Sequence, residues 1–221
     1  VEVAPIAHYH MGGVRVNAAM ETRVPNLFAA GEAVGGANGA NRLSGNAISE
    51  AFVFGEHAGA AAAARAKARG ASGWNAKTAA AGLAFLNSHG KTAAAPNTAA
   101  LLVELQALMA DNAGPFRTEA KLTEALLRLE QMQRELGALP GGGDAHYNMV
   151  RLDWLDLRNM LLVAQTVVLA ALERRESRGA HQREDYPGLA PEWELNQVLS
   201  WREGKIGLSR APARPNAQAV K

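Results

Sequence analysis

Leucine recurs at three- and four-residue spacing in the second half of the chain, and this pattern predicts helices with one apolar face each. Two such stripes are Leu101, Leu102, Leu105, Leu108 and Met109, and then Leu122, Leu126, Leu129, Met132 and Leu136. A third helix is predicted over 145–176, with Asp144 as its N-cap, and it is apolar on most of its circumference. Residues 97–178 are therefore expected to form a three-helix bundle with the third helix at its centre.

The first 65 residues have a different pattern. Residues 1–7 (VEVAPIA) and 27–30 (LFAA) have strand character, and each runs into a polar or glycine-rich bend. Helical spacing begins near Gly45. We expect an α/β segment over 1–65, a helical connector over 66–96 and an irregular, proline-containing tail over 179–221. The predicted fold class is α+β and mostly helical.

Composition excludes several classes of function. The chain has no cysteine, so it contains no disulfide, thiolate nucleophile, iron–sulfur ligand or zinc finger. Its net charge is +2 with interleaved signs, so no nucleic-acid partner is expected. The longest apolar run, 160–172, is short of the roughly 20 residues that span a bilayer, so no membrane insertion is expected. The chain opens on Val1 in sequence typical of the middle of a strand, which suggests a fragment.

The stretch LFAAGEAVGGANGANRLSGNAI, residues 27–48, places a glycine-rich loop between a strand and a helix start. Such loops present backbone N–H groups to a ligand in α/β proteins. Glu32 is placed to accept hydrogen bonds from ligand hydroxyls, and Arg42 offers a planar fork to a carboxylate or phosphate. Alternatively, the glycines only shape a turn and Arg42 forms a surface salt bridge. No GxGxxG or GxxxxGK[ST] motif is present.

The stretch IAHYHMGGV, residues 6–14, holds two histidines on one side of an extended chain. His8 and His10 could form a metal pair, but no third ligand is visible, and we expect no metal site. A neutral histidine donating a hydrogen bond within a cleft is another interpretation. A polar turn around a buried Tyr9 is a third.

Four motifs occur in order along the chain: HYHMGGVRV, PNLFAAGEA, GANRLSGNAISEAFVFGEHAG and RRESRGAHQREDYP. Together they resemble the flavoprotein subunit of succinate dehydrogenase and fumarate reductase, a family that includes L-aspartate oxidase. The resemblance covers nearly all of this chain but only the C-terminal part of the family's chain. It implies the end of an FAD-binding α/β domain, followed by the helical bundle and a tail.

The resemblance also implies roles for individual residues. His8 matches the family's substrate-binding histidine, and Arg42 matches the arginine that clamps a substrate carboxylate near the flavin. Glu32 matches an acid that contacts the ribitol or ribose region of FAD. Ala47 and Ile48 match positions whose backbone lies against the isoalloxazine ring.

Two positions depart from the family's pattern. Asn38 stands where a histidine is usual, which puts a polar contact in doubt, and Ala47 stands where serine is common, which leaves only a backbone role there. In the last motif, Arg178, His181 and Arg183 are expected to be mostly structural.

The resemblance implies an FAD-dependent oxidoreductase that interconverts a dicarboxylate and its α,β-unsaturated partner, as succinate and fumarate interconvert. No catalytic residue is assigned here, because the family's proton-shuttling arginine and dinucleotide fingerprint lie upstream. This fragment alone is expected to be inactive and not to retain FAD.

An electron-transfer partner subunit is expected, with the protein in the cytoplasm or peripheral on the cytoplasmic side of a membrane. L-aspartate oxidase-like amine oxidation, or a non-catalytic helical interaction module, are the alternatives.

Overall fold

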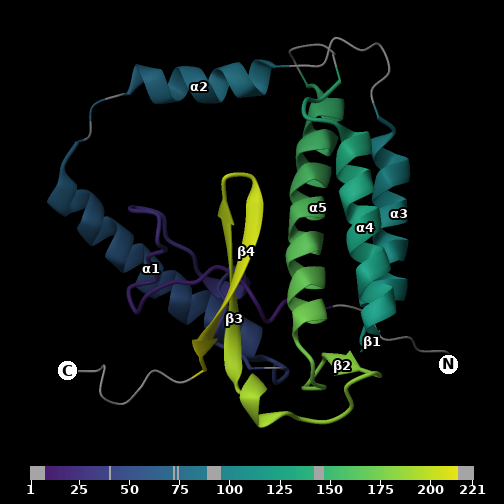
Figure 1. The fold of residues 1–221 in the computed structure, drawn as a ribbon. Coiled ribbons are helices and arrows are strands. Elements are labelled where there is room, and N and C mark those ends of the chain that lie inside the picture. Colours follow the sequence, from purple (N-terminus) through teal and green to yellow (C-terminus); the bar gives the residue numbers. More distant parts are fainter. Residues whose placement is uncertain are drawn as a thin grey trace. The chain divides into compact units, whose positions relative to one another are not determined.

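The computed structural model describes residues 8–39, 41–71, 73, 75–88, 96–141 and 147–213. The chain divides into two compact units, Val1–Asn75 and Ala76–Lys221 (Figure 1). The first contains the short 3-10 helix η1, Gly31–Ala33, and the long helix α1, Asn46–Arg69. The second begins with α2, Ala76–Asn87, and holds the bundle and the strands. The predicted fold class, α+β and mostly helical, is confirmed.

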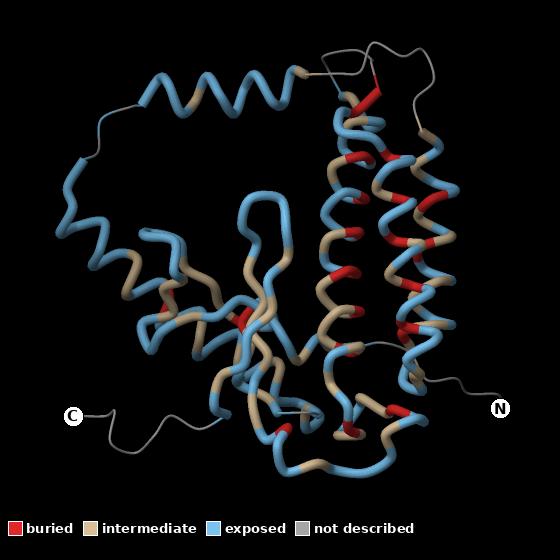
Figure 2. The backbone as a smooth tube through the Cα atoms, viewed as in Figure 1, coloured by how far each residue is buried: buried red, intermediate tan, exposed pale blue. Residues whose placement is uncertain are grey.

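Three helices of the second unit form the bundle: α3, Thr98–Ala113; α4, Glu119–Leu136; and α5, Met149–Glu173. Their buried positions lie on the faces that point toward one another (Figure 2). The core contains Leu101, Leu105, Ala113, Leu122, Ala125, Leu129, Met132, Leu136, Trp154, Leu157, Leu161, Ala164, Val168 and Ala171. Burial of these apolar side chains is the main favourable term for this unit.

Side chains cap the start of each bundle helix. The side chains of Asn97, Thr118 and Asn148 accept hydrogen bonds from backbone N–H groups three residues ahead, in α3, α4 and α5 respectively. Asp144, the predicted cap of the third helix, lies outside the described residues. The helix begins at Met149, later than predicted, and its cap is Asn148.

Helix α5 is long and apolar enough, by length and composition, to cross a membrane, with a mean hydropathy of 1.5 in its most apolar window. It is longer than the apolar run 160–172 because flanking polar residues also belong to the helix. One face of it packs in the bundle core, and the Nε1 of Trp154 on that face donates a hydrogen bond to the carbonyl of Leu136 (3.1 Å). One third of its most apolar window is buried within the described part of the chain.

Short strands join the end of the bundle. Strand β1, Phe116–Arg117, pairs in parallel with β2, Gln182–Arg183. Strand β3, Leu195–Arg202, and β4, Lys205–Pro212, form an antiparallel hairpin that follows the 3-10 helix η2, Pro191–Trp193.

The hairpin corrects the prediction that 179–221 is an irregular tail. Its two-residue turn, Glu203 and Gly204, has positive φ at both positions, as tight hairpin turns require. Glu-Gly is a weaker turn signal than Asn-Gly or Asp-Gly, and the prolines around it favoured a loop.

The first unit buries little apolar surface of its own. Helix α1 continues through Arg69, beyond residue 65, and Ala58 is its buried residue. Ile48 and Phe52 are 67% and 76% exposed. Much of the apolar surface of α1 therefore lies uncovered by the described part of the chain.

We predict that Leu129→Ala lowers the free energy of unfolding by about 3 kcal/mol, because it leaves a cavity at a fully buried position of α4. The matched control is Leu127→Ala on the same helix, where the side chain is 58% exposed and the expected change is within about 0.5 kcal/mol. Equilibrium denaturation measures both. Equal losses in the two variants would contradict the packing of this core.

Candidate functional site

Two chain segments of the first unit are held together by backbone contact. Val14 N donates to the carbonyl of Ala33 (2.7 Å), and Gly35 N donates to the carbonyl of Val14 (3.1 Å). A Cβ on Gly13 would lie 2.6 Å from the Ala33 oxygen, and one on Gly35 would lie 2.8 Å from Gly13 N. Glycine is therefore required at both positions by the protein's own backbone. The contact fixes the segment that carries His8 against η1.

Glu32 lies in η1 and faces this segment. Its Oε1 accepts a hydrogen bond from the backbone N of His10 (2.9 Å). The carboxylate is exposed and keeps acceptor capacity for a further donor. A ligand hydroxyl is a donor of the kind that this position would accept.

Arg42 lies in the glycine-rich loop before α1, and its guanidinium stacks on the ring of Tyr9. The Cζ atom lies 4.3 Å from the ring centroid, within the range of a cation–π interaction. Nη1 donates to the carbonyl of Leu43 (3.1 Å), and the buried Nε has no hydrogen-bond partner among the described residues. The Arg42 guanidinium is thus held against Tyr9, which directly follows His8 in the sequence.

Glu50, on the first turns of α1, anchors the Tyr9 ring. The hydroxyl of Tyr9 donates to Glu50 Oε2 (2.5 Å), and Asn38 Nδ2 donates to Glu50 Oε1 (2.6 Å). The hydrogen bond to Glu50 raises the pKa of Tyr9. The hydrogen bonds from Tyr9 and Asn38 lower the pKa of Glu50. No sequence signal singles out Glu50, because its position on a helix resembles that of any exposed acid.

Both histidines of the HxH pair are exposed, and the ring of His10 lies near Gly12. Among the described residues, no group of three His, Cys, Asp or Glu side chains is arranged to hold a metal ion.

Ala47 and Ile48 lie at the start of α1, where the backbone is open to a ligand. Gly45, the N-cap, has a φ of 89° and provides no side-chain cap. A Cβ on Gly36, Gly39 or Gly45 would meet nothing within 4 Å. The N–H groups of Asn46 and Ile48 donate to the carbonyls of Leu43 and Gly45 (3.3 Å each), and the Ile48 side chain is exposed. An apolar side chain beside a glycine-rich turn fits the face of a flat ring such as a flavin.

The structure therefore brings the predicted residues into one unit. The segment 8–10 contacts Glu32 through the backbone of His10 and contacts Arg42 through the ring of Tyr9. Ala47 and Ile48 lie on the same helix as Glu50, which anchors that ring. Their roles toward substrate and flavin remain predictions.

A second polar cluster lies at the end of the bundle, in the other unit. Glu176 is buried, and its carboxylate accepts hydrogen bonds from Arg174 (2.6 Å), from Arg178 (2.7 and 3.0 Å) and from the backbone N of Ala190 (3.0 Å). Burial alone would raise the pKa of Glu176, but these hydrogen bonds outweigh it and hold the pKa at about 2. Arg178 is thus engaged within the protein.

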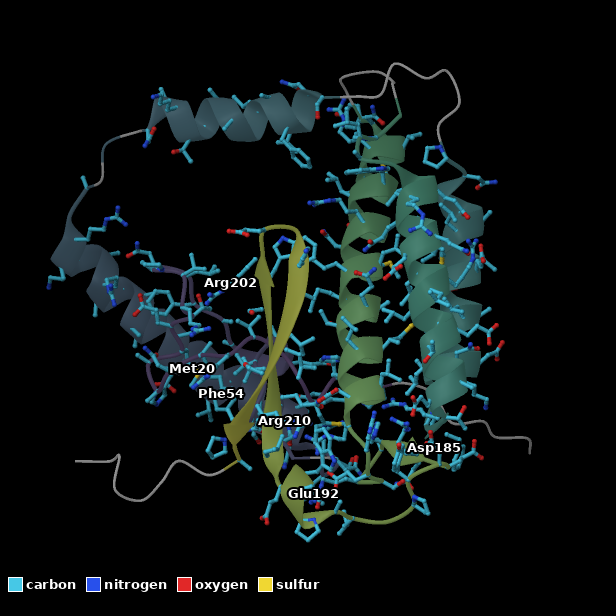
Figure 3. The ribbon with its side chains drawn as sticks, viewed as in Figure 1. Met20, Phe54, Asp185, Glu192, Arg202 and Arg210 are labelled. Atoms are coloured by element: carbon cyan, nitrogen blue, oxygen red, sulfur yellow. The ribbon has the colours of Figure 1, made fainter. Side chains whose placement is uncertain are left out.

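Arg183 is buried and closes the end of α5. Its guanidinium makes a two-point ion pair with Asp185 (2.7 and 2.8 Å), which lies beside β2 (Figure 3). It also donates to the backbone carbonyls of Ala171, Leu172 and Arg174. Asp185 in turn accepts from the backbone N of Glu119, at the start of α4. A hydrogen-bonded pair of this kind satisfies the last carbonyls of one helix and the first N–H of another.

His181 is held as a neutral imidazole. Its Nδ1 lies 2.7 Å from Arg117 Nη1, and its Nε2 lies 3.2 Å from the carbonyl of Arg174. The arginine can only donate, so Nδ1 accepts and Nε2 carries the proton. Burial and the charge of Arg117 lower the pKa of His181 to about 4.

The first unit thus has the features of a flavin-binding segment, and a helical bundle follows it in sequence. Residues 1–48 match the FAD binding domain model, and residues 103–216 match the model described as Fumarate reductase flavoprotein C-term. The chain belongs to the fumarate reductase flavoprotein family. FAD is the cofactor of this family.

Named relatives agree with this assignment. The chain is 37% identical over 200 residues to a fumarate reductase (CoM/CoB) of Methanothermobacter marburgensis, covering 90% of this chain and 36% of that one. It is 34% identical over 197 residues to an L-aspartate oxidase of Pseudomonas aeruginosa, a match that covers 87% of this chain and 34% of the oxidase. A quinol fumarate reductase structure from E. coli superimposes with a TM-score of 0.82 at 29% identity, and the match covers 96% of this chain and 37% of the E. coli chain. The chain spans about a third of the length of these relatives.

We predict a pH dependence of stability that comes from His181. Its pKa is about 4 in the fold, against 6.5 for an unperturbed histidine, so between these values the unfolded chain binds more protons. The free energy of unfolding should therefore fall as the pH falls from 6.5 toward 4. Glu176 and Asp185 have pKa values of about 2 in the fold, so each causes a separate loss of stability at lower pH. That loss begins below pH 4.5 for Glu176 and below pH 3.8 for Asp185, the ordinary pKa values of these groups.

His181→Gln should remove the loss of stability between pH 6.5 and 4 and keep the loss caused by the two carboxylates at lower pH. Glutamine keeps a neutral donor and acceptor but does not titrate. Denaturation curves at a series of pH values measure this. His57→Gln, at an exposed histidine on α1, is the control and should keep the wild-type profile. An unchanged slope between pH 6.5 and 4 in His181→Gln would refute the assignment.

Proposed function

We propose that this chain is part of an FAD-dependent oxidoreductase that interconverts a C4 dicarboxylate and its α,β-unsaturated partner. The observation that carries the proposal is the guanidinium of Arg42 held over Tyr9, the residue next to His8. Arg42 makes no ion pair with a carboxylate among the described residues. A cation held in this way is available to an anionic substrate.

The roles of the side chains follow from their chemistry. The planar guanidinium of Arg42 binds a substrate carboxylate at two points, and His8 donates a hydrogen bond to the same molecule. Glu32 accepts from hydroxyls of FAD, and the backbone of Ala47 and Ile48 lies against its ring. FAD, when bound, supplies the hydride chemistry, while these residues orient the substrate.

The matched segment of the relatives is about a third of their length, so the remaining parts of the active site are expected elsewhere in the full protein. These include the proton donor and the adenine-nucleotide site. We infer that the 221-residue chain alone is inactive and does not retain FAD.

We also infer that the full protein passes electrons to a partner subunit. Its relatives include proteins named as flavoprotein subunits, among them one of an 8-methylmenaquinol:fumarate reductase. A cytoplasmic location, or a peripheral one on the cytoplasmic side of a membrane, is consistent with a role beside such a partner. The family match over 1–48 and 103–216 disfavours the non-catalytic interaction module.

L-aspartate oxidation is the second candidate, because L-aspartate oxidases also match most of this chain. We predict that the full-length protein reduces fumarate with a reduced dye and releases no hydrogen peroxide from aspartate above background. A peroxide-coupled assay and a dye-oxidation assay on the same preparation measure the two activities. Peroxide release from aspartate without fumarate reduction would replace the first candidate with the second.

We predict that Arg42→Ala in the full-length protein raises the KM for the dicarboxylate about 100-fold, by loss of a two-point charge-assisted contact, and leaves the bound flavin in place. Steady-state kinetics and the flavin-to-protein absorbance ratio measure the two quantities. Arg23→Ala, at an exposed arginine of the same unit, is the control and should match the wild type. Loss of flavin from Arg42→Ala with an unchanged KM would show that this side chain serves the cofactor instead.

A further inference from the structure

Arg42 has few contacts of its own that fix the direction of its guanidinium. The loop that carries it contains Gly36 and Gly45, both at positive φ, and Gly39 with nothing near a Cβ. Its one side-chain hydrogen bond within the described part of the chain goes to the carbonyl of the next residue, Leu43, and Nε has no partner there. Outside this loop, the contact that the described residues show for the guanidinium is its stacking on the Tyr9 ring.

The Tyr9 ring is itself held from a third element. Its hydroxyl donates to Glu50 Oε2 on α1, a residue 41 positions away in sequence. Glu50 Oε1 accepts from Asn38, which lies in the same loop as Arg42. The contacts thus form a closed circuit from the loop to segment 8–13, to α1 and back to the loop.

The circuit also keeps Glu50 away from a direct ion pair with Arg42. Each carboxylate oxygen of Glu50 is engaged, one by Tyr9 and the other by Asn38, and no Arg42–Glu50 ion pair occurs among the described salt bridges. A carboxylate paired directly with Arg42 would compete with a substrate carboxylate for the same N–H groups. With Tyr9 between them, the acid orients the arginine and leaves its donors available.

We propose that Tyr9 and Glu50 are positioning residues that set the plane of the Arg42 guanidinium for two-point binding of a substrate carboxylate. The inference rests on the proposed function, in which Arg42 binds the substrate. Tyr9 supplies the face on which the guanidinium lies, and Glu50 fixes that face through the tyrosine hydroxyl. The pair acts through Arg42 and has no contact with the reacting atoms.

The test is a double-mutant cycle in the full-length flavoprotein. Malonate, a dicarboxylate that cannot be desaturated, is titrated against the flavin absorption spectrum, so the readout is a Kd and requires no turnover. Tyr9→Phe removes one oxygen and should weaken malonate binding about tenfold, the value of one hydrogen bond that involves a charged group. Glu50→Gln should weaken it similarly while the flavin content stays at the wild-type level.

The decisive measurement repeats Tyr9→Phe in an Arg42→Lys background. An ammonium has no plane to orient, so Tyr9→Phe should change the Kd less than about twofold there. Tyr147→Phe, at an exposed tyrosine of the other unit, is the control and should leave the Kd unchanged in both backgrounds.

The outcomes separate the two hypotheses. If Arg42→Ala leaves malonate binding unchanged, the proposed function fails. If Arg42→Ala abolishes binding but Tyr9→Phe and Glu50→Gln do not weaken it, or weaken it equally in the Arg42→Lys background, the positioning role alone is overturned. Should Tyr9→Phe lose its flavin, the same cycle with Glu50→Gln decides by the same criterion.

Discussion

A helix with one apolar face is stabilised when that face is covered, and among the described residues only the bundle helices cover one another in this way. In the bundle, α3, α4 and α5 cover one another, so residues such as Leu122 and Leu161 are fully buried. In the first unit, α1 leaves Ile48 and Phe52 exposed. The bundle is organised around its own core, whereas the site segment is organised by backbone contacts and a few polar side chains.

The polar cluster at the end of the bundle shows how charges are tolerated beside such a core. Two buried charges, Arg183 and Glu176, are hydrogen-bonded by the chain segments around them. A buried charge without partners would cost several kcal/mol. The cluster connects the last turn of α5 to β2 and to the start of α4. The β3–β4 hairpin is connected to the same region through Arg210. The Arg210 guanidinium stacks on Trp193 (4.2 Å) and pairs with Glu173, the last residue of α5 (2.7 Å). Four charged residues of the RRESRGAHQREDYP motif, Glu176, Arg178, Arg183 and Asp185, are thus engaged in contacts within this unit.

Sequence periodicity predicted the bundle helices because the apolar spacing that gives each helix its buried face is a local feature of the sequence. The stripes at Leu101 and Leu122 and the polar residues before them specify α3 and α4. The predicted start of the third helix, at 145, is four residues too early, because several polar residues precede α5 and the structure caps the helix with Asn148. The β3–β4 hairpin was not predicted, because its turn residues are uncommon in tight turns and prolines surround it. Spacing alone left the role of Arg42 open, and the four ordered motifs favoured a substrate clamp. The contact between Tyr9 and Glu50 spans 41 residues and has no local signature, so only the three-dimensional structure reveals it.

The close approach of Gly13 and Gly35 bears on how variation in this protein should be interpreted. Either glycine, changed to any larger residue, would push the histidine-bearing segment off η1, because the added Cβ would clash with the protein's own backbone. A survey of inactive variants would then rank both positions beside true binding residues. A variant can be inactive here either because a larger side chain does not fit or because a residue that binds the ligand has been lost. Flavin content measured alongside activity is needed to tell these two causes apart.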